Sequence, residues 1–381
     1  LLVLHSQYGK KNAMKAAQGK ELGDIDAMLT VDVIPMPSLE DLPSKKRKTH
    51  VIVETRAVAL ACGDCRVLSG KTRRFQGPPS FPYIPGGDCS GIVREIPTEA
   101  SNDPDFPFQV GDRVAARFTE GPRGALAEFS IMDTTVMEKI PKNLSFEEGA
   151  ILASVAPATL LAERIKEGER VLIMGAGGGI GSHTCQIMRK QGAAFLAGVS
   201  LETDRLLQGP LNYDKAFNYS KEDPFSIAEF KEDPFDVVVD LAGGSWLRLI
   251  EDHTNKDVSI VKPASQGGRY LTLTPDVAIF EADSLLDLLK PFMLIPLWRF
   301  FKSRLWGRRY LPRYTFAHSL DFERSHLTRT MNMAENGTLK AVMDSRGPFP
   351  FTTEGVRKAF RLQETRHVHG KIVIQVPKPS M

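Results

Sequence analysis

The sequence predicts an α/β fold, a doubly wound parallel sheet combined with a β-rich part, and three observations carry this prediction. First, Val171–Met174 is a short apolar run, which is typical of a parallel strand buried on both faces. Second, a glycine-rich turn follows at once and leads into a segment with helical character at 183–190. Third, further apolar strand patterns recur with helical patterns between them, at 195–200, 235–244 and 268–273.

The turn after the first of these strands predicts a dinucleotide site. Aligned on Gly181 it reads Ala176-x-Gly178-x-x-Gly181, so that alanine replaces the first glycine of the usual pattern. Small residues let the backbone approach a pyrophosphate, and the free N–H groups at a helix start point at its charge. A glycine-rich turn also occurs for conformational reasons alone. The strand at 195–200 ends about twenty residues after the last glycine, as a dinucleotide-binding unit requires, and this context favours the nucleotide site.

Composition limits the class of protein. A chain of 381 residues predicts two domains and can bury a substantial core. The formal net charge of +3 is too small to indicate nucleic-acid binding. The four cysteines, Cys62, Cys65, Cys89 and Cys185, are too few for a disulfide framework in a chain of this length, so a reducing compartment is expected.

The first part of the chain predicts a β-rich, barrel-like domain built from short strands with Gly and Pro turns. Expected strands lie at 25–34, 50–59, 86–96, 110–115 and 124–131. The basic run at 44–49 is expected to be a solvated loop.

Helical patterns and a last strand complete the chain. Residues 144–163 are expected to be helical, with Ser145 as N-cap and Glu148 three residues on. A helix is expected over 321–336, and the alternating tail at 370–376 is a strand that should pair within the β-rich domain. The expected domains are residues 1–150, 151–320 and 321–381, the last returning to the first.

Several landmarks together give the chain a family resemblance. They are Asp64 with Gly70, Pro85-Gly86, Gly111–Val114, Gly124–Phe129, the glycine turn and Gly370–Val373. In this order and spacing they resemble the medium-chain dehydrogenase/reductase superfamily, and within it the zinc-free quinone oxidoreductase branch. The chain is similar to the reticulon-interacting mitochondrial oxidoreductase group and to organellar quinone oxidoreductase homologues. The resemblance implies a Rossmann doubly wound sheet inserted into a GroES-like β-rich domain, and a homodimer is plausible on the same ground.

The cysteines suggest a metal site, but the resemblance to the superfamily argues against one. In zinc-dependent relatives the first ligand cysteine corresponds to Ala61, and the ligand histidine corresponds to Gly87. The region 151–159, which would supply the third ligand, contains no Cys, His or acid. Zinc requires three or four converging ligands, so the pair Cys62 and Cys65 predicts two small apolar residues and the protein is expected to be zinc-free.

The residues that the resemblance assigns to the nucleotide favour NADPH. Ser200 stands where NAD-using members carry an acid, and Arg205 where quinone oxidoreductases carry a lysine that contacts the 2′-phosphate. Tyr219 matches a tyrosine on the adenosine side, whereas Glu202 and Asp204 nearby argue for NADH. The full expected cofactor set is Gly175, Ala176, Gly178, Gly179, Ile180, Gly181, Ser200, Arg205, Tyr219, Ala242 and Gly243.

The expected reaction is hydride transfer from NADPH to an apolar quinone or α,β-unsaturated carbonyl compound, and the candidate pocket residues are Asp64, Arg66 and Thr159. The chain departs from the branch at Ala61-Cys62, where Asn-Pro is usual, and at Arg66, where a tyrosine is usual. These departures leave two alternatives open. One is a weakly catalytic or non-catalytic accessory subunit docked on an organelle-membrane assembly, and the other is an enoyl thioester or lipid reductase.

Residues 285–309 form an unusual segment in which apolar and aromatic residues alternate with arginine and lysine. Charges and two prolines interrupt it too often for a membrane span. It fits an interfacial segment on an anionic membrane or a membrane complex, and equally a buried helix pair with a basic rim. Together with the resemblance, this predicts a soluble or peripheral protein of the mitochondrion or chloroplast rather than the cytoplasm.

Overall fold

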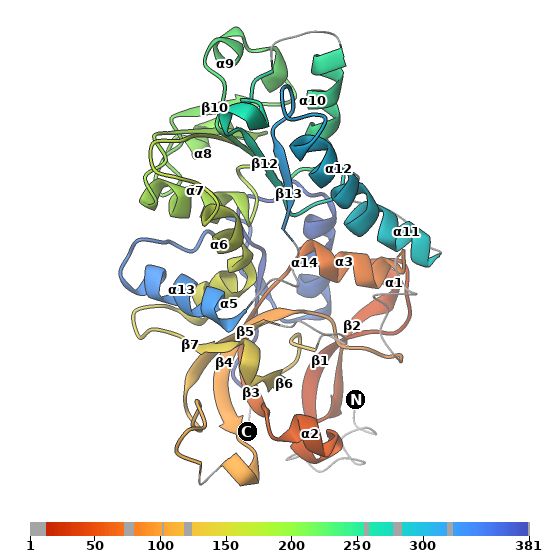
Figure 1. Cartoon of the computed structure of the whole chain (residues 1–381). Coiled ribbons are helices and arrows are strands. Elements are labelled where there is room, and N and C mark those ends of the chain that lie inside the picture. Colours follow the sequence, from red (N-terminus) through yellow and green to blue (C-terminus); the bar gives the residue numbers. More distant parts are fainter. Residues whose placement is uncertain are drawn as a thin grey trace. The chain divides into compact units, whose positions relative to one another are not determined.

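The computed structural model describes residues 13–71, 80–100, 103–117, 124–254, 259–276, 284–317 and 323–379. The chain forms two compact units. Unit 1 comprises Leu1–Ala156, Glu323–Gly337 and Ala341–Met381, and unit 2 comprises Pro157–Phe322 and Thr338–Lys340. Figure 1 labels their helices and strands.

Unit 2 is built on a six-stranded sheet in which every neighbouring pair is parallel. Its strands are β8 (Arg170–Met174), β9 (Phe195–Ser200), β10 (Lys215–Asn218), β11 (Val237–Asp240), β12 (Arg269–Thr272) and β13 (Arg313–Phe316). Their order in the sheet is β10-β9-β8-β11-β12-β13. The chain adds β8, β9 and β10 toward one side of the sheet and then β11, β12 and β13 toward the other, so the order of the strands changes sense between β8 and β11. This is the doubly wound topology, and it confirms the expected α/β fold.

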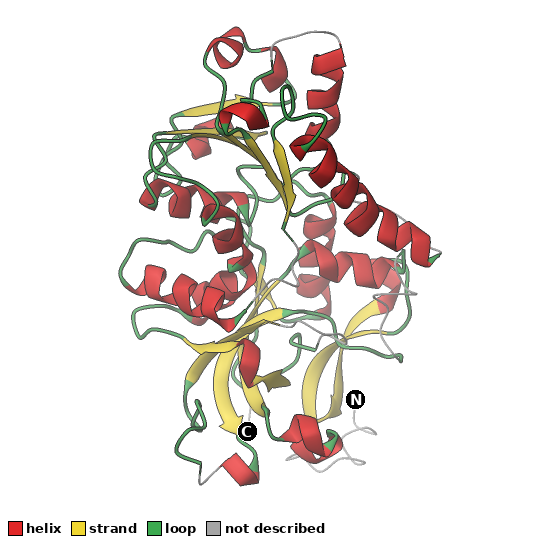
Figure 2. Cartoon of the chain, in the orientation of Figure 1, coloured by secondary structure: helices red, strands yellow, loops and turns green. Residues whose placement is uncertain are grey.

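The helices of unit 2 flank this sheet, as Figure 2 shows. They are α6 (Pro157–Ala162), α7 (Gly181–Lys190), α8 (Thr203–Leu206), α9 (Ala228–Glu232), α10 (Ser245–Thr254), α11 (Leu285–Leu289), the π-helical turn η7 (Lys290–Leu294) and α12 (Ile295–Arg304). The central strand β8 is buried on both faces, because the side chains of Val171, Leu172 and Ile173 are fully covered. The apolar run therefore folds as its composition predicts.

Three large aromatic residues fill the core of unit 2 beside β12 and β13. The indole of Trp246 meets the rings of Tyr270 and Tyr314 edge-on, with centroids 5.2 and 4.8 Å apart, and the two tyrosines stack at 5.6 Å. Edge-to-face and offset contacts of this kind add to the free energy gained by burying the rings.

Unit 1 holds the β-rich part of the chain. Its larger sheet has the order β14-β15-β3-β4-β5-β7, with β6 paired to β3, and β1 and β2 form a separate antiparallel pair. The strands are β1 (Ala13–Gly19), β2 (Leu29–Pro35), β3 (His50–Ala59), β4 (Asp88–Glu95), β5 (Arg113–Arg117), β6 (Phe129–Asp133), β7 (Met137–Lys139), β14 (Phe349–Pro350) and β15 (Val373–Gln375). The tail strand β15 pairs antiparallel with β3, so the last strand of the chain lies in the same sheet as a strand from its first part.

The helices of unit 1 are α1 (Ile25–Met28), α2 (Ser44–Arg47), α3 (Cys62–Ser69), α5 (Phe146–Val155), α13 (Arg324–Glu335) and α14 (Thr353–Glu364). The capping residues of α5 are those the sequence predicts. The Ser145 hydroxyl accepts from the Glu148 N–H at 3.1 Å, and the Glu148 carboxylate accepts from the Ser145 N–H at 2.7 Å. In the helix expected over 321–336, residues 321 and 322 lie outside the described part.

Three local expectations in unit 1 are wrong for identifiable reasons. The strand expected over 25–34 begins only at Leu29, because the Asp24 carboxylate accepts from Asp26 N and Ala27 N and caps a one-turn helix. In the basic run at 44–49, Ser44–Arg47 form a one-turn helix, because the N–H groups of Lys46 and Arg47 donate to the Pro43 carbonyl. The strand expected over 124–131 starts at Phe129, since the backbone N–H groups just before it donate to Pro85 and Gly86 instead.

Candidate nucleotide-binding site

The glycine turn of unit 2 leaves the central strand at the carboxyl edge of the sheet. Gly175 has a positive φ of +81°, a conformation that favours glycine. The N–H groups of Gly175 and Ala176 both donate to the Val199 carbonyl of β9, at 3.1 and 3.0 Å. The turn is therefore fixed against the neighbouring strand before the chain enters α7.

Gly181 and Gly178 of the turn differ in the space that a side chain would have. A Cβ at Gly181 would lie 2.4 Å from the Gly175 carbonyl oxygen and 2.8 Å from that of Ala176, so a larger residue cannot fit without moving the backbone. A Cβ at Gly178 would meet only the Gly175 carbonyl oxygen, at 3.5 Å. The turn is thus closed toward the protein and open at Gly178, as a site for an incoming pyrophosphate requires.

The start of α7 is held by its own side chains. The Ser182 N–H donates to the Gly178 carbonyl at 3.0 Å, and Nδ1 of the buried His183 lies 2.6 Å from the Gly179 carbonyl oxygen. That contact is a hydrogen bond when Nδ1 carries the ring proton. The sequence analysis did not single out His183, although its place in the first helical turn was visible in the sequence.

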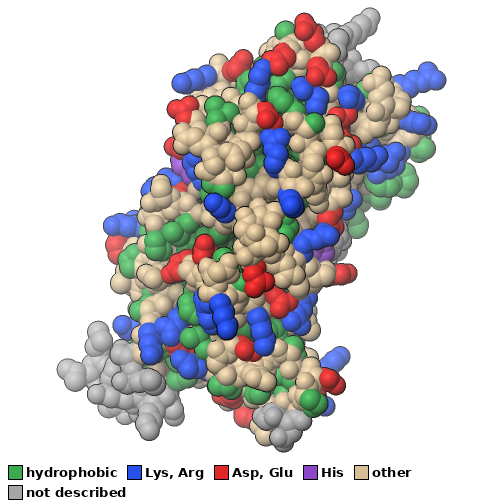
Figure 3. All heavy atoms as spheres, turned by 90° about the vertical axis from the view of Figure 1, so that its left-hand side faces the viewer, with side chains coloured by type: hydrophobic (Ala, Val, Ile, Leu, Met, Phe, Trp, Pro, Cys, Tyr) green, Lys and Arg blue, Asp and Glu red, His purple; other side chains and the backbone are tan. Residues whose placement is uncertain are grey.

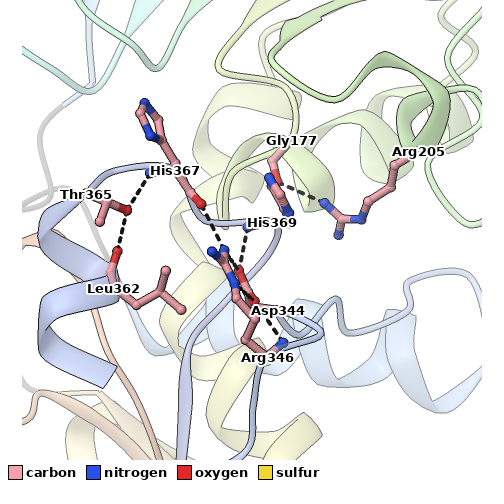
Figure 4. A network of polar contacts seen from close by, with 8 residues as sticks. All are labelled: Gly177, Arg205, Asp344, Arg346, Leu362, Thr365, His367 and His369. Carbon is pink, nitrogen blue, oxygen red and sulfur yellow. Dashed lines mark hydrogen bonds and ion pairs between the residues drawn. The ribbon is translucent and has the colours of Figure 1, made fainter. Parts of the chain in front are cut away.

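The residues expected at the ribose and adenosine end lie beside this turn. Ser200 ends β9, and Arg205 of α8 donates from Nη1 to the Gly177 carbonyl at 3.4 Å, as Figure 4 shows. The Ser200 hydroxyl would be 2.7 Å from a Cβ at Gly177, so it packs closely on the turn. Tyr219 follows β10 and is exposed, and β10 pairs with β9 with Asn218 opposite Ser200. The structure brings these residues to one edge of the sheet.

Asp240, at the end of β11, organises the other side of the site. Its Oδ1 accepts from Ala242 N at 3.0 Å and Gly243 N at 2.7 Å, and its Oδ2 accepts from Ser245 N at 3.0 Å. A Cβ at Gly175 would be 3.4 Å from Ala242 N, so the loop that Asp240 holds touches the glycine turn. Sequence reasoning included Ala242 and Gly243 but missed Asp240, although an acid directly before Leu-Ala-Gly-Gly at a strand end was a visible signal.

The Asp240 carboxylate receives a fourth hydrogen bond from the Tyr270 hydroxyl, at 2.5 Å. Burial, reinforced by the negative charge of Asp240, raises the pKa of Tyr270 well above its usual range. The phenol therefore stays protonated and remains a donor. A buried carboxylate with four donors is a rigid support for the loop after β11.

The candidate catalytic residues lie in both units. In unit 1, Asp64 and Arg66 are on α3, where the buried Asp64 carboxylate accepts from Ala61 N at 2.8 Å. Asp64 therefore caps its own helix and holds its N-terminal turn in place. Arg66 is half-exposed on the same helix. In unit 2, Thr159 is fully buried in α6.

Among the described residues, no group of three or more His, Cys, Asp or Glu side chains could hold a metal ion. The thiols near α3 have other neighbours. Cys62 accepts from Nε2 of Gln363 at 3.3 Å, and the Cys89 thiol lies 3.8 Å from the Met132 sulfur. Burial raises the pKa of Cys65 and Cys89 far above the usual thiol range, as expected of thiols among apolar neighbours.

Two family models match the chain. The model described as "Alcohol dehydrogenase GroES-like domain" matches residues 47–142, and the model described as "Zinc-binding dehydrogenase" matches residues 211–374. The chain belongs to the medium-chain dehydrogenase/reductase superfamily. This membership confirms the resemblance seen in the sequence and explains the GroES-like and Rossmann parts of the fold.

Curated members of this superfamily resemble the chain over most of its length. The "NADPH-dependent alkenal/one oxidoreductase, chloroplastic" of Arabidopsis thaliana is 26% identical over 367 residues, which is 95% of this chain and 79% of the relative. The mitochondrial "NAD(P)H oxidoreductase RTN4IP1" of Danio rerio is 27% identical over 366 residues, 91% of this chain and 88% of the relative.

Solved structures of the superfamily share the fold. A quinone oxidoreductase of Coxiella burnetii superimposes with a TM-score of 0.67 at 20% identity, covering 96% of this chain and all of that one. A quinone oxidoreductase of Pseudomonas syringae gives 0.68 at 21% identity, covering 95% of this chain and all of that one. At these identities the likeness shows the fold alone.

Proposed function

We propose that the protein is an NADPH-dependent, zinc-free reductase that delivers a hydride to a quinone or another α,β-unsaturated carbonyl compound. The observation that carries the proposal is the glycine turn, open at Gly178 and fixed between β9 and the Asp240 loop at the carboxyl edge of a doubly wound sheet. Relatives named as alkenal/one and quinone oxidoreductases support the substrate class.

In this proposal the residues at the carboxyl ends of the unit 2 strands divide the nucleotide among them, each group of residues binding one part of it. The turn Gly178–Gly181 and the start of α7 bind the pyrophosphate through backbone N–H groups. Ser200 and Arg205 bind the 2′-phosphate of the ribose, because Ser200 adds no negative charge and Arg205 is positive at all working pH values. Tyr219 packs on the adenosine. Gly175, Ala176, Ala242 and Gly243 keep the turn and its neighbouring loop in place.

Bound NADPH would supply the hydride, and the chain's own residues would position the acceptor and exclude water. The candidate substrate residues of this proposal are Thr159, buried in α6 of unit 2, and Asp64 and Arg66 on α3 of unit 1. Asp64 acts by fixing the conformation of α3 rather than as an acid. A reduced quinone or enolate can take its proton from solvent, so the proposal needs no metal and no dedicated acid.

Nucleotide titration of the purified protein tests the proposal. We expect NADPH to bind more tightly than NADH, and Arg205→Ala to weaken NADPH binding about tenfold while leaving NADH binding unchanged. Lys190→Ala is the matched control, because Lys190 is an exposed cation at the opposite end of α7. Turnover with a panel of quinones, enones and enoyl thioesters then assigns the substrate. Equal binding of both nucleotides, or none, would overturn the cofactor assignment.

Two further expectations accompany the function. We propose that the protein works in a mitochondrion or chloroplast, since relatives with these locations in their names match most of the chain. We also propose that residues 285–309 attach it to a membrane surface or membrane complex and that it forms a homodimer. No helix among the described residues is long and apolar enough to cross a membrane.

The accessory-subunit alternative is favoured by one observation, the large exposed apolar surface on α11 and α12. A subunit that works by docking would keep the fold and this surface without needing turnover. Nucleotide binding together with no turnover of any compound in the panel would support this alternative over the reductase.

A further inference from the structure

The helix α12 buries polar side chains and exposes apolar ones. Its buried positions are Pro296, Arg299 and Ser303, whereas Trp298 is 59% exposed and its neighbours Leu297, Phe300 and Phe301 are exposed as well. A surface helix of a globular protein normally does the reverse, with its apolar stripe toward the core and its polar side chains in water. These apolar side chains therefore face solvent in the described chain, where ring contacts join Phe300 to Phe301 and Trp298 to Trp306.

Polar contacts hold the helix in this orientation. Arg299 is only 8% exposed and binds Asp276 with both ends of its guanidinium, at 2.7 and 2.5 Å. Ser303 Oγ accepts from the Tyr314 N–H at 3.0 Å, and Arg304 donates to the Tyr314 carbonyl at 2.9 Å. These bonds tie α12 to β13, so its outward face is fixed by the fold. Arg299 is therefore the buried anchor of α12 and does not belong to the cations around its exposed face.

The exposed apolar surface is concentrated in this one segment. Nine of the fourteen exposed large hydrophobic residues in the described chain lie between 286 and 306. They are Leu286, Met293, Leu294, Leu297, Trp298, Phe300, Phe301, Leu305 and Trp306. Within α12, Leu297 and Phe301 lie one turn apart and share a face. The rings of Trp298 and Trp306 lie 6.1 Å apart. Figure 1 shows α11 and α12 following one another along one side of unit 2. A contiguous patch of this kind marks an interaction site, and it excludes the alternative of a buried helix pair.

The charges around this patch have one sign. Besides the paired Arg299, residues 285–309 contain Lys290, Lys302, Arg304, Arg308 and Arg309 against the single acid Asp287. The excess is thus five cations less one acid, or +4. On the face drawn in Figure 3, by contrast, basic and acidic side chains are interspersed. A partner that fits the patch must be apolar and negatively charged.

An anionic membrane meets both requirements, and a second copy of the chain does not. A two-fold interface would bring together two patches with the same excess of positive charge, which disfavours association. At a membrane surface, tryptophan and phenylalanine enter the headgroup layer while lysine and arginine pair with anionic lipids. The absence of a spanning helix among the described residues fits attachment in the plane of the surface.

We propose that residues 285–309 dock the protein on an anionic lipid membrane, with the exposed face of α12 and Trp306 in the headgroup layer and the surrounding cations against lipid phosphates. This proposal identifies the partner in the attachment of residues 285–309 proposed above, and it rests on that attachment. It does not depend on hydride transfer. Nucleotide titration tests the reductase proposal, and vesicle binding tests the membrane proposal, so either proposal can fail without the other.

Vesicle binding of the full-length protein is the test. We expect co-sedimentation with vesicles of phosphatidylcholine and phosphatidylglycerol at low salt, little with phosphatidylcholine alone, and a loss as salt screens the charges. The double variant Trp298→Ser with Trp306→Ser should bind at least tenfold more weakly. Leu207→Ser with Leu247→Ser is the matched control, because both leucines are exposed apolar residues of unit 2 outside the segment.

A second variant and a second readout keep the test decisive. Arg308→Glu with Arg309→Glu changes only exposed residues and should also abolish binding to anionic vesicles. Circular dichroism and the melting temperature check that the variants are folded. No binding of the wild-type protein to anionic vesicles would overturn the proposal. So would unchanged binding of the tryptophan variant, or a wild-type dimer that this variant dissociates, because a second copy would then cover the patch.

Discussion

The Tyr270 hydroxyl and the Asp240 carboxylate, on neighbouring strands of the parallel sheet, are joined by a buried hydrogen bond of 2.5 Å. Through it the aromatic core of unit 2 supports the loop that touches the glycine turn. The same carboxylate accepts from three backbone N–H groups of that loop. Packing far inside the unit is thus coupled to the geometry of the candidate nucleotide site.

Asp240→Asn should therefore loosen the loop and weaken NADPH binding. Asparagine offers one acceptor oxygen in place of two and has no charge, so at least one donor loses its partner, which costs about 1–3 kcal/mol. We expect a rise in the Kd for NADPH of about tenfold, measured by titration. Asp236→Asn is the control, because Asp236 lies before β11 at the opposite edge of the sheet and pairs with Lys262. A similar rise in both variants would contradict a specific role for Asp240.

Substitutions at two glycines should separate folding from binding. Gly178→Ala should leave the melting temperature nearly unchanged, because its Cβ would meet no protein atom closer than 3.5 Å, but it should weaken NADPH binding at least tenfold by occupying the pyrophosphate position. Gly181→Ala should lower the melting temperature, since its Cβ would lie 2.4 Å from a backbone oxygen. Calorimetry and nucleotide titration of both variants check this. Unchanged NADPH binding by Gly178→Ala would show that the turn does not hold the nucleotide.

Ser200→Asp should reverse the cofactor preference. A carboxylate at the end of β9 can accept hydrogen bonds from the ribose hydroxyls of NADH and repels the 2′-phosphate of NADPH. We expect NADPH to bind about tenfold more weakly and NADH to bind as well as or better than in the wild type. Ser220→Asp, on the exposed turn beyond β10, serves as the control. An unchanged ratio of the two dissociation constants would place the phosphate elsewhere.

The sequence could predict those features that depend on local pattern. The apolar run 171–174 and the glycines after it indicate strand, turn and helix because buried parallel strands and phosphate turns have few alternatives. Ser145 and Glu148 form the expected capping box because both partners lie within one helical turn. The strand expected over 124–131 starts late because its N–H groups have partners at 85 and 86, far along the chain, that no local pattern reveals.

Dependence on a partner far along the chain also explains why the sequence did not reveal the orientation of α12. Its sequence shows apolar and basic residues at helical spacing, but the orientation depends on the partner of Arg299, and that partner is Asp276, 23 residues away. Once the guanidinium is buried, the aromatic face must point outward. The role of Asp240 likewise depends on Tyr270, 30 residues away and on another strand.

The ion pair of the buried Arg299 with the partly buried Asp276 should contribute to the stability of unit 2. Arg299→Met leaves the carboxylate of Asp276 without its bidentate partner, and such a loss costs about 1–3 kcal/mol. We expect the melting temperature to fall by several degrees. The double variant Arg299→Met with Asp276→Leu should recover part of this loss, because no charge is then left unpaired. Lys302→Met is the neighbouring control, and equal melting temperatures of Arg299→Met and the wild type would contradict the assignment.

Acid stability of unit 1 should depend on Asp344. Burial alone would raise the pKa of this carboxyl, but hydrogen bonds from the Arg346 guanidinium, at 2.8 and 2.6 Å, and from the His369 N–H, at 2.8 Å, outweigh it and lower the pKa to about 2. Figure 4 shows this cluster. Because the unfolded pKa is about 3.9, the stabilisation is fully present above that value and is lost as the pH falls toward 2.

Arg346→Ala should therefore move acid unfolding to higher pH, since Asp344 then takes up its proton earlier. We expect circular dichroism during an acid titration to show the midpoint displaced upward between about pH 2 and pH 4, and the stability difference from the wild type to shrink below this window. Lys358→Ala is the control, because Lys358 and Glu354 form an exposed pair that water already solvates. If Arg346→Ala and Lys358→Ala unfold at the wild-type midpoint, the Asp344 cluster does not govern acid stability, and other carboxylates must be protonated before unit 1 opens.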